Sequence, residues 1–416
     1  MVTLALTGGV LGSWPAAAQE GPKDRRAAIQ DLLDRRAKAF LERDEAGFMA
    51  TVSRSHPAFF QRQLRAFRWA DGVPFTSYRL VANWDLLGDL ARPSDAARHP
   101  GAADIALPVT QERYTLGRYD EQPAVEDLFL TLVREGDRWL VGSDSDLEDV
   151  GLRSSRHLWD RGPIREQRSE HFSLLSHPCG SPAGCPALPE GLLSLAEGAL
   201  ERVDEHWSGP WRRRVVLLVP STQEELAEII QATFELDDFV AFATSTVDIE
   251  QDLAYGGHRI LLNPTALDGR PDESLSIILA HELLHVATRT VSGPFVPTFV
   301  EEGIAEYVGR DADPAGLSYL DSRIAVGDFD AALPQNWEFI TGSSDDIYTS
   351  YQEAQSAVHF FVQRWGKRDL VSFYRSLGRR RVTAGTSAYH LDRALRATTG
   401  VGAQRFEELW ADSIAG

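Results

Sequence analysis

Lysine, cysteine and positive charge are all scarce in this chain of 416 residues. Only three lysines, Lys23, Lys38 and Lys367, stand among its 42 basic residues, and 61 acidic residues leave a formal net charge of -19 at pH 7. A protein that binds nucleic acid needs a positive surface to meet the phosphates, so we expect no nucleic-acid partner. The composition, 43% hydrophobic and 25% charged, is typical of folded globular proteins and excludes wholesale disorder.

Long hydrophobic runs are also missing, apart from the first residues of the chain. No later stretch reaches the roughly 18 to 20 uncharged apolar residues of a membrane span, so we expect none. Residues 1–18 are uncharged, largely apolar and end in Ala16-Ala17-Ala18, as a secretory signal peptide does, although no Lys or Arg precedes Lys23. We therefore expect an extracytoplasmic protein, secreted or held in the cell envelope; a disordered apolar tail is the alternative.

The two cysteines, Cys179 and Cys185, lie in a segment rich in glycine and proline. An even pair in an exported protein indicates one disulfide that closes a short loop. A metal-binding pair is the alternative, but the Cys-x-x-Cys spacing that is typical of such pairs is absent. We expect the disulfide.

The first part of the chain reads as a helix followed by extended stretches. Apolar residues recur at helical spacing over 24–49. The stretches that follow are 77–81, 104–116 and a hairpin of 128–133 with 139–141. A helix packed by a curved antiparallel sheet is an α+β cone. The segment 127–141 resembles the last hairpin of the nuclear transport factor 2-like (SnoaL-like) fold, which implies such a domain over residues 24–160.

Turn-forming residues without sustained periodicity, between about 162 and 189, indicate a boundary near 165 and a second domain over 165–416. Its first half alternates predicted helices and strands, whereas the chain from 274 onward is largely helical. The helices before 274 are predicted over 190–207 and 221–232, the latter opening on a capping box of Ser221 and Glu224, and the strands over 214–219, 239–246 and 258–262.

The strongest chemical signal is His281-Glu282-Leu283-Leu284-His285, inside a predicted helix over 274–288. Four residues is just over one helical turn, so both imidazoles project from one face and can converge on one ion. A catalytic zinc takes three protein ligands and a water, and Glu282, turned about 100° around the helix, can reach that water as general base. The pattern is permissive, and an amphipathic helix with both histidines on its surface is the alternative.

The next predicted helix, 297–308, contains Glu301-Glu302-Gly303-Ile304-Ala305-Glu306-Tyr307. A carboxylate here can fold back as the third ligand. With this helix, residues 190–416 resemble the gluzincin metallopeptidases, and within them the peptidase MA-like group of exported bacterial proteins. The resemblance implies a thermolysin-like zincin domain with a small sheet, a zinc helix and a helical C-terminal lobe. It implies that Glu302 binds Zn²⁺, that Glu301 does not, and that Glu306 orients His281.

Two further segments resemble parts of a gluzincin cleft. Residues 348–362 resemble a helix whose tyrosine donates its hydroxyl to the tetrahedral intermediate; this implies Tyr351, with Tyr348 as a substitute and a packed edge residue as the alternative. Residues 255–264 resemble the strand that lines the cleft, with which an extended peptide can pair. The Gly-x-Met-Glu-Asn signature of aminopeptidases is missing, which favours an endopeptidase. Thr288 and Val291 stand where metzincins have Gly and a third His, which excludes that group.

Together these features predict a secreted, zinc-dependent peptidase, an endopeptidase, that acts on a peptide or protein substrate. A zinc-bearing, non-catalytic binding or assembly protein of the cell envelope is the main alternative. A zinc hydrolase of non-peptide substrates is a third.

Overall fold

The computed structural model describes residues 21–85, 91–186, 188–237, 239–248, 254–327, 331–378 and 385–415. The predicted signal peptide, 1–18, lies outside these residues. Over the described residues the protein mixes many helices with three small sheets, which confirms the expected α+β class. Within that range, no helix combines the length and the apolar character needed to cross a membrane.

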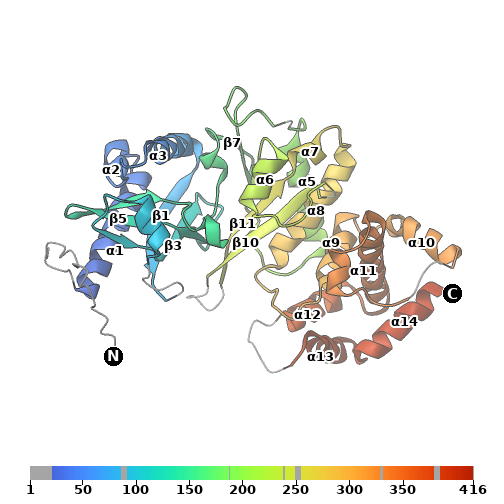
Figure 1. Ribbon diagram of the computed structural model, residues 1–416. Coiled ribbons are helices and arrows are strands. Elements are labelled where there is room, and N and C mark those ends of the chain that lie inside the picture. Colours follow the sequence, from blue (N-terminus) through green and yellow to red (C-terminus); the bar gives the residue numbers. More distant parts are fainter. Residues whose placement is uncertain are drawn as a thin grey trace, which may run out of the picture.

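The described residues of the N-terminal part, 21–85 and 91–164, hold four α-helices and two three-stranded antiparallel sheets (Figure 1). The helices are α1 (Pro22–Leu41), α2 (Glu45–Met49), α3 (Pro57–Trp69) and α4 (Pro93–Arg98). One sheet is β1 (Phe75–Asn83), β3 (Val109–Leu116) and β4 (Ala124–Phe129); the other is β2 (Asp104–Ala106), β5 (Thr131–Glu135) and β6 (Arg138–Ser143). Helix α1 packs along β1 and buries Ile29, Leu32 and Leu33.

Three predicted elements of this part are divided in the structure. The helix predicted over 24–49 is broken at Arg43, whose φ of 60° no helix interior adopts, and α3 was not predicted. The stretch 104–116 forms two strands, because Pro108 has no amide hydrogen for a ladder. The stretch 128–133 is divided at Leu130 between β4 and β5, which belong to different sheets.

The C-terminal part, residues 165–415, begins with a five-stranded sheet in the order β10-β11-β9-β8-β7. Its strands are β7 (Arg165–Arg168), β8 (Phe172–Ser176), β9 (Val215–Val219), β10 (Ala241–Asp248) and β11 (Ala254–Leu262). The three inner strands run parallel, and the two outer ones are antiparallel to their neighbours. The predicted boundary near 165 is where β7 begins, although β7 and β8 themselves were not predicted.

Both faces of this sheet are buried, and they face different partners. On one face Val215, Leu217 and Val219 of β9 share a core with α5 (Leu192–His206) and α8 (Asp272–Thr288). On the other face Val216 and Leu218 share a core with the N-terminal part, and α6 (Gln223–Ile229) adds Leu226 to it. Because side chains alternate between the two faces of a strand, β9 packs against the C-terminal helices on one face and against the N-terminal part on the other.

Helices make up the rest of the C-terminal part (Figure 1). They are α7 (Pro264–Leu267), α8, α9 (Thr298–Gly309), α10 (Ser318–Ala325), α11 (Ser344–Trp365), α12 (Lys367–Leu377), α13 (Ser387–Thr399) and α14 (Ala403–Ala415). Helix α9 contacts both α8 and α11.

The N-cap of α6 differs from the prediction by one residue. It is Thr222 and not Ser221, and the Thr222 hydroxyl accepts a hydrogen bond from the Glu225 amide.

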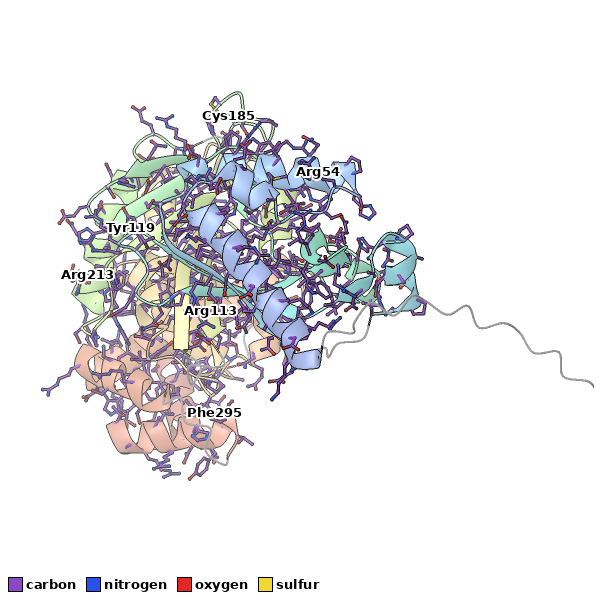
Figure 2. All side chains as sticks on the ribbon, turned by 90° about the vertical axis from the view of Figure 1, so that its left-hand side faces the viewer. Arg54, Arg113, Tyr119, Cys185, Arg213 and Phe295 are labelled. Carbon is purple, nitrogen blue, oxygen red and sulfur yellow. A yellow bond between two sulfur atoms is a disulfide. The ribbon has the colours of Figure 1, made fainter. Side chains whose placement is uncertain are left out.

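The predicted disulfide is present. The sulfur atoms of Cys179 and Cys185 are bonded, and the pair closes a loop of six residues' separation between β8 and α5. Figure 2 shows Cys185 on a loop at the upper edge of the molecule, away from the bulk of the fold. The bond therefore constrains a surface connection between two elements of the C-terminal part.

Candidate metal centre

The three predicted metal ligands meet where α9 packs against α8. The Nε2 atoms of His281 and His285 lie 3.1 Å apart. Glu302 Oε2 lies 3.1 Å from the first and 3.4 Å from the second. The two imidazoles are only 12% and 15% exposed, so the alternative of two histidines on a solvated helix face does not hold.

This spacing fits a divalent cation. Ligands about 2.0 to 2.1 Å from a tetrahedral zinc lie about 3.3 Å from one another, and all three separations fall near that value. Two imidazole nitrogens and a carboxylate oxygen are also a donor set that zinc accepts. The other His and carboxylate grouping with such spacing in the described residues, Glu205, His206 and Asp311, has two exposed carboxylates.

The charges around His281, His285 and Glu302 favour a positive charge at the point where these three side chains meet. Burial alone would lower the pKa of His281, but hydrogen bonds to Glu302 and Glu306 and their charges raise it well above its usual value. Burial alone would raise the pKa of Glu302, but His285 and His281 hold it well below its usual value. Glu302 is therefore ionised at neutral pH, as a metal ligand must be.

Glu306 supports His281 from one turn along α9. Its Oε1 lies 3.1 Å from His281 Nδ1, and its Oε2 accepts a hydrogen bond of 2.9 Å from Arg310 Nε. A carboxylate on Nδ1 sets the tautomer that leaves Nε2 free for a metal. The structure thus places Glu306 as predicted, and adds Arg310, which the i, i+4 spacing from Glu306 allowed but sequence reasoning missed.

Glu301, the neighbour of Glu302, faces away from the metal ligands. Its Oε1 accepts hydrogen bonds from the hydroxyl of Ser292 and, at 3.4 Å, from that of Tyr374. Adjacent helix residues are turned about 100° apart, so only one of the two carboxylates can face α8. The choice of Glu302 over Glu301 follows from the packing of α9.

Glu282 lies at the edge of the sheet. Its Oε2 accepts a hydrogen bond of 2.7 Å from the amide of Ala243 in β10. The sheet order leaves β10 without a second neighbouring strand among the described residues, whereas β11 lies between β10 and β9. The expectation that the strand over 255–264 offers an edge for peptide pairing is therefore wrong, and β10 is the edge strand beside the centre.

Tyr351 lies beside the ligands on α11. Its ring centroid is 6.3 Å from that of His281 and 5.2 Å from that of Phe339. Burial, together with the charges of Glu302, Glu282 and Glu306, raises its pKa far above the usual value, so the phenol keeps its proton. Tyr348 is 40% exposed and contacts Tyr319 instead, so Tyr351 is the better placed of the two.

No known family model matches the chain. No curated protein matches it either.

Proposed function

We propose that this protein is a zinc-dependent endopeptidase of the gluzincin type. The observation that carries the proposal is the convergence of His281, His285 and Glu302 beside Glu282, which itself contacts an open strand edge. In this proposal the C-terminal part is a thermolysin-like zincin domain and the N-terminal part a nuclear transport factor 2-like cone. The disulfide accords with an extracytoplasmic location.

Each residue has a defined task in the proposed reaction. His281, His285 and Glu302 would hold a zinc ion, which when bound would make a water acidic enough to lose a proton near neutral pH. The carboxylate of Glu282 would accept a proton from the water that attacks the peptide carbonyl, and would return it to the leaving amine. Tyr351 donates its hydroxyl to the developing oxyanion. Main-chain groups of β10 orient the substrate as an added strand.

The proposal is tested with Glu282→Gln in the purified full chain, with zinc measured by elemental analysis and cleavage of an unfolded protein measured with and without chelator. Loss of the general base should lower turnover about 10²- to 10⁴-fold while one zinc per chain remains. Glu273→Gln, in the exposed first turn of the same helix, is the matched control and should cleave as the parent does.

The other possible outcomes contradict the mechanism or indicate one of the two alternative functions. A Glu282→Gln variant that cleaves as fast as the parent would show that this mechanism is wrong. A parent that holds zinc but cleaves neither peptides nor small esters and amides is the non-catalytic envelope protein. A parent that hydrolyses only the esters or amides is the hydrolase of non-peptide substrates.

A further inference from the structure

The open edge of β10 can hold a polypeptide strand. The Ala243 amide points away from β11, because it donates to Glu282. Main-chain groups of a strand alternate in direction, so Ser245 and Val247 present theirs on the same open side. Side chains of an added strand would then alternate between the two faces of the sheet. A substrate that passes Glu282 along this edge therefore meets both faces.

The two faces of the sheet differ in what covers them next to β10. One face carries α8 and the metal ligands. The other faces the N-terminal part across a cavity of about 590 Å³, which we call the junction cavity. Residues 244–247 of β10 line it from one side, and Val125, Asp127 and Phe129 of β4 line it from the other. Its volume lies within the range of ordinary ligand pockets, about 300 to 1,000 Å³.

Close contacts at the end of β10 set the width of the junction cavity. The Thr246 hydroxyl accepts a hydrogen bond of 2.8 Å from the Val125 amide. Gly257 in β11 has φ of +59°, and a Cβ there would lie 2.5 Å from Ala124 Cβ. A side chain at this position would force β4 and β11 apart. The two parts of the chain are thus held together here, and the cavity beside this contact is built into the fold.

Part of the wall of the junction cavity is apolar and suits a bulky apolar side chain, whereas Glu126, Arg153 and Arg156 are among the charged residues that line the rest. Leu218, Ile230 and Leu261 line it from the C-terminal part. Phe129 and Trp159 add aromatic surface from the N-terminal part. Burying such a side chain against these residues is favourable by about 1.5–3 kcal/mol when the burial is complete.

We propose that the junction cavity is a specificity pocket of the peptidase, which takes a bulky apolar side chain of a polypeptide lying along β10. In this proposal the N-terminal part contacts a side chain of the substrate and contributes to the cleavage specificity, instead of serving as a separate module. This inference rests on the proposed peptidase function.

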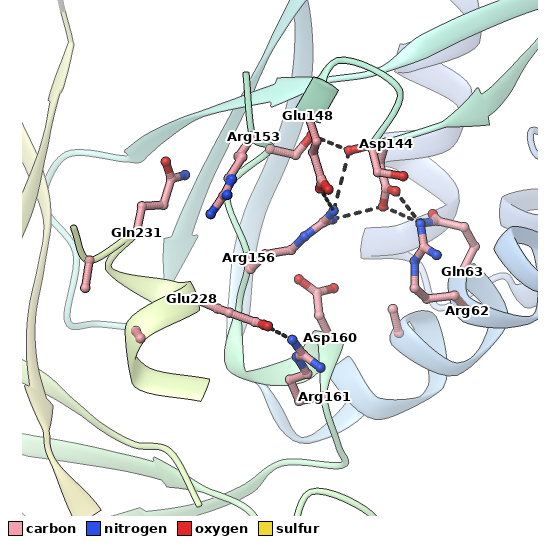
Figure 3. A pocket seen from close by; sticks show the side chains of 15 residues that line it. Arg62, Gln63, Asp144, Glu148, Arg153, Arg156, Asp160, Arg161, Glu228 and Gln231 are labelled. Carbon is pink, nitrogen blue, oxygen red and sulfur yellow. Dashed lines mark hydrogen bonds and ion pairs between the residues drawn. The ribbon is translucent and has the colours of Figure 1, made fainter. Parts of the chain in front are cut away.

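A neighbouring cavity provides the control for the experiment. This second cavity (Figure 3) has a volume of about 530 Å³ and shares Arg153, Arg156 and Gln231 with the junction cavity. None of its lining residues belongs to β10. Its walls carry ion pairs: Arg62 and Arg156 both contact Asp144, Arg156 also contacts Glu148, and Arg161 contacts Glu228. Ser145 lines this second cavity, so a large side chain there disturbs the junction between the two parts without approaching the edge strand.

The test measures cleavage of a peptide library by mass spectrometry, with the full zinc-loaded chain. Asp127→Trp fills the junction cavity from β4, and the control variant Ser145→Trp adds the same bulk to the second cavity. Asp127→Trp should lower the kcat/KM ratio of bulky apolar over glycine at one substrate position about tenfold or more. The Ser145→Trp control should keep the parent ratio.

Three results would contradict the proposal that the junction cavity is a specificity pocket. One is an Asp127→Trp variant that folds and has the cleavage profile of the parent. If that variant does not fold, Phe129→Ala enlarges the same cavity and should shift the preference toward larger residues; an unchanged profile there also overturns the pocket. In both cases cleavage by the parent shows that the peptidase itself stands, whereas a parent without metal-dependent cleavage overturns the peptidase and the pocket with it.

Discussion

Two adjacent carboxylates in α9 have different surroundings, and this difference predicts that only one of them matters for metal affinity. Glu302 faces both histidines, whereas Glu301 binds the hydroxyls of Ser292 and Tyr374. We expect Glu302→Gln to weaken zinc binding by about a hundredfold or more, since even residues outside the ligand set cost 10- to 100-fold. Glu301→Gln should retain the parent affinity.

Competition with a chromophoric chelator measures both affinities, and thermal unfolding shows that the variants are folded. The reverse order of effects, with Glu301→Gln the weaker binder, would contradict the ligand set.

The hydroxyl of Tyr351 is the second prediction at this scale. Because its raised pKa keeps the phenol protonated, it can donate to the oxyanion over the whole working range of a zinc peptidase. We expect Tyr351→Phe to lower kcat about 10²- to 10³-fold with little change in KM, since the contact forms in the transition state. Tyr348→Phe, on the exposed face of the same helix, is the control. Equal kcat values for the two variants would leave Tyr351 as a packing residue.

At the scale of elements, the metal centre depends on how closely α9 approaches α11. A Cβ on Gly303 would lie 2.5 Å from the carbonyl oxygen of Ala354, so no larger residue fits between the two helices as they stand. Helix α9 carries Glu302 and Glu306, and its displacement from α11 would move both relative to the histidines. The close packing of the two helices therefore explains why a glycine follows Glu302.

We expect Gly303→Ala to lower the free energy of unfolding by about 1–3 kcal/mol, because overpacking must push the helices apart. Gly198→Ala in α5 is the matched control. A Cβ there meets nothing within 4 Å, so the change should raise helix stability by about 0.5–1 kcal/mol. Urea unfolding measures both, and a Gly303→Ala variant as stable as the parent would contradict the close packing.

At the scale of the whole molecule, the two parts of the chain are joined by a shared core and a buried ion pair. Leu175, Val216 and Leu218 of the sheet belong to the same apolar cluster as the helices of the N-terminal part. Arg259 of β11 makes two hydrogen bonds of 2.6 and 2.7 Å to Asp120, and the two side chains are 5% and 2% exposed. Removal of residues 21–160 would expose this face, so the C-terminal part is not expected to fold well alone.

The ion pair gives the prediction at this scale. Asp120→Ala leaves the Arg259 guanidinium buried without its carboxylate and the Leu116 amide without its acceptor, and should lower the free energy of unfolding by about 3–5 kcal/mol. The double variant Asp120→Ala with Arg259→Met removes both charges and should recover most of that loss. Denaturant unfolding of the parent, the single and the double variant checks this. A double variant no more stable than the single one would contradict an electrostatic cause.

Local pattern predicted much of the C-terminal part and less of the N-terminal one. The helix with the two histidines, the helix with Glu302, and β9 were predicted within a few residues, because each is a strongly apolar run. The break at Arg43, the helix α3 and the division at Leu130 were missed. These depend on which surface each segment packs against, which a window of local sequence does not contain.

The sequence by itself determined the chemistry that this protein can offer. The spacing of His281 and His285 puts two imidazoles on one face of a helix, and no tertiary contact is needed to see it. The tertiary structure decided which groups join them. The packing of α9 on α8 selects Glu302 over Glu301, and the sheet order makes β10 the edge that Glu282 touches. Spacing along one helix is a local property, whereas the partner across a helix pair or a sheet depends on residues far apart in the chain.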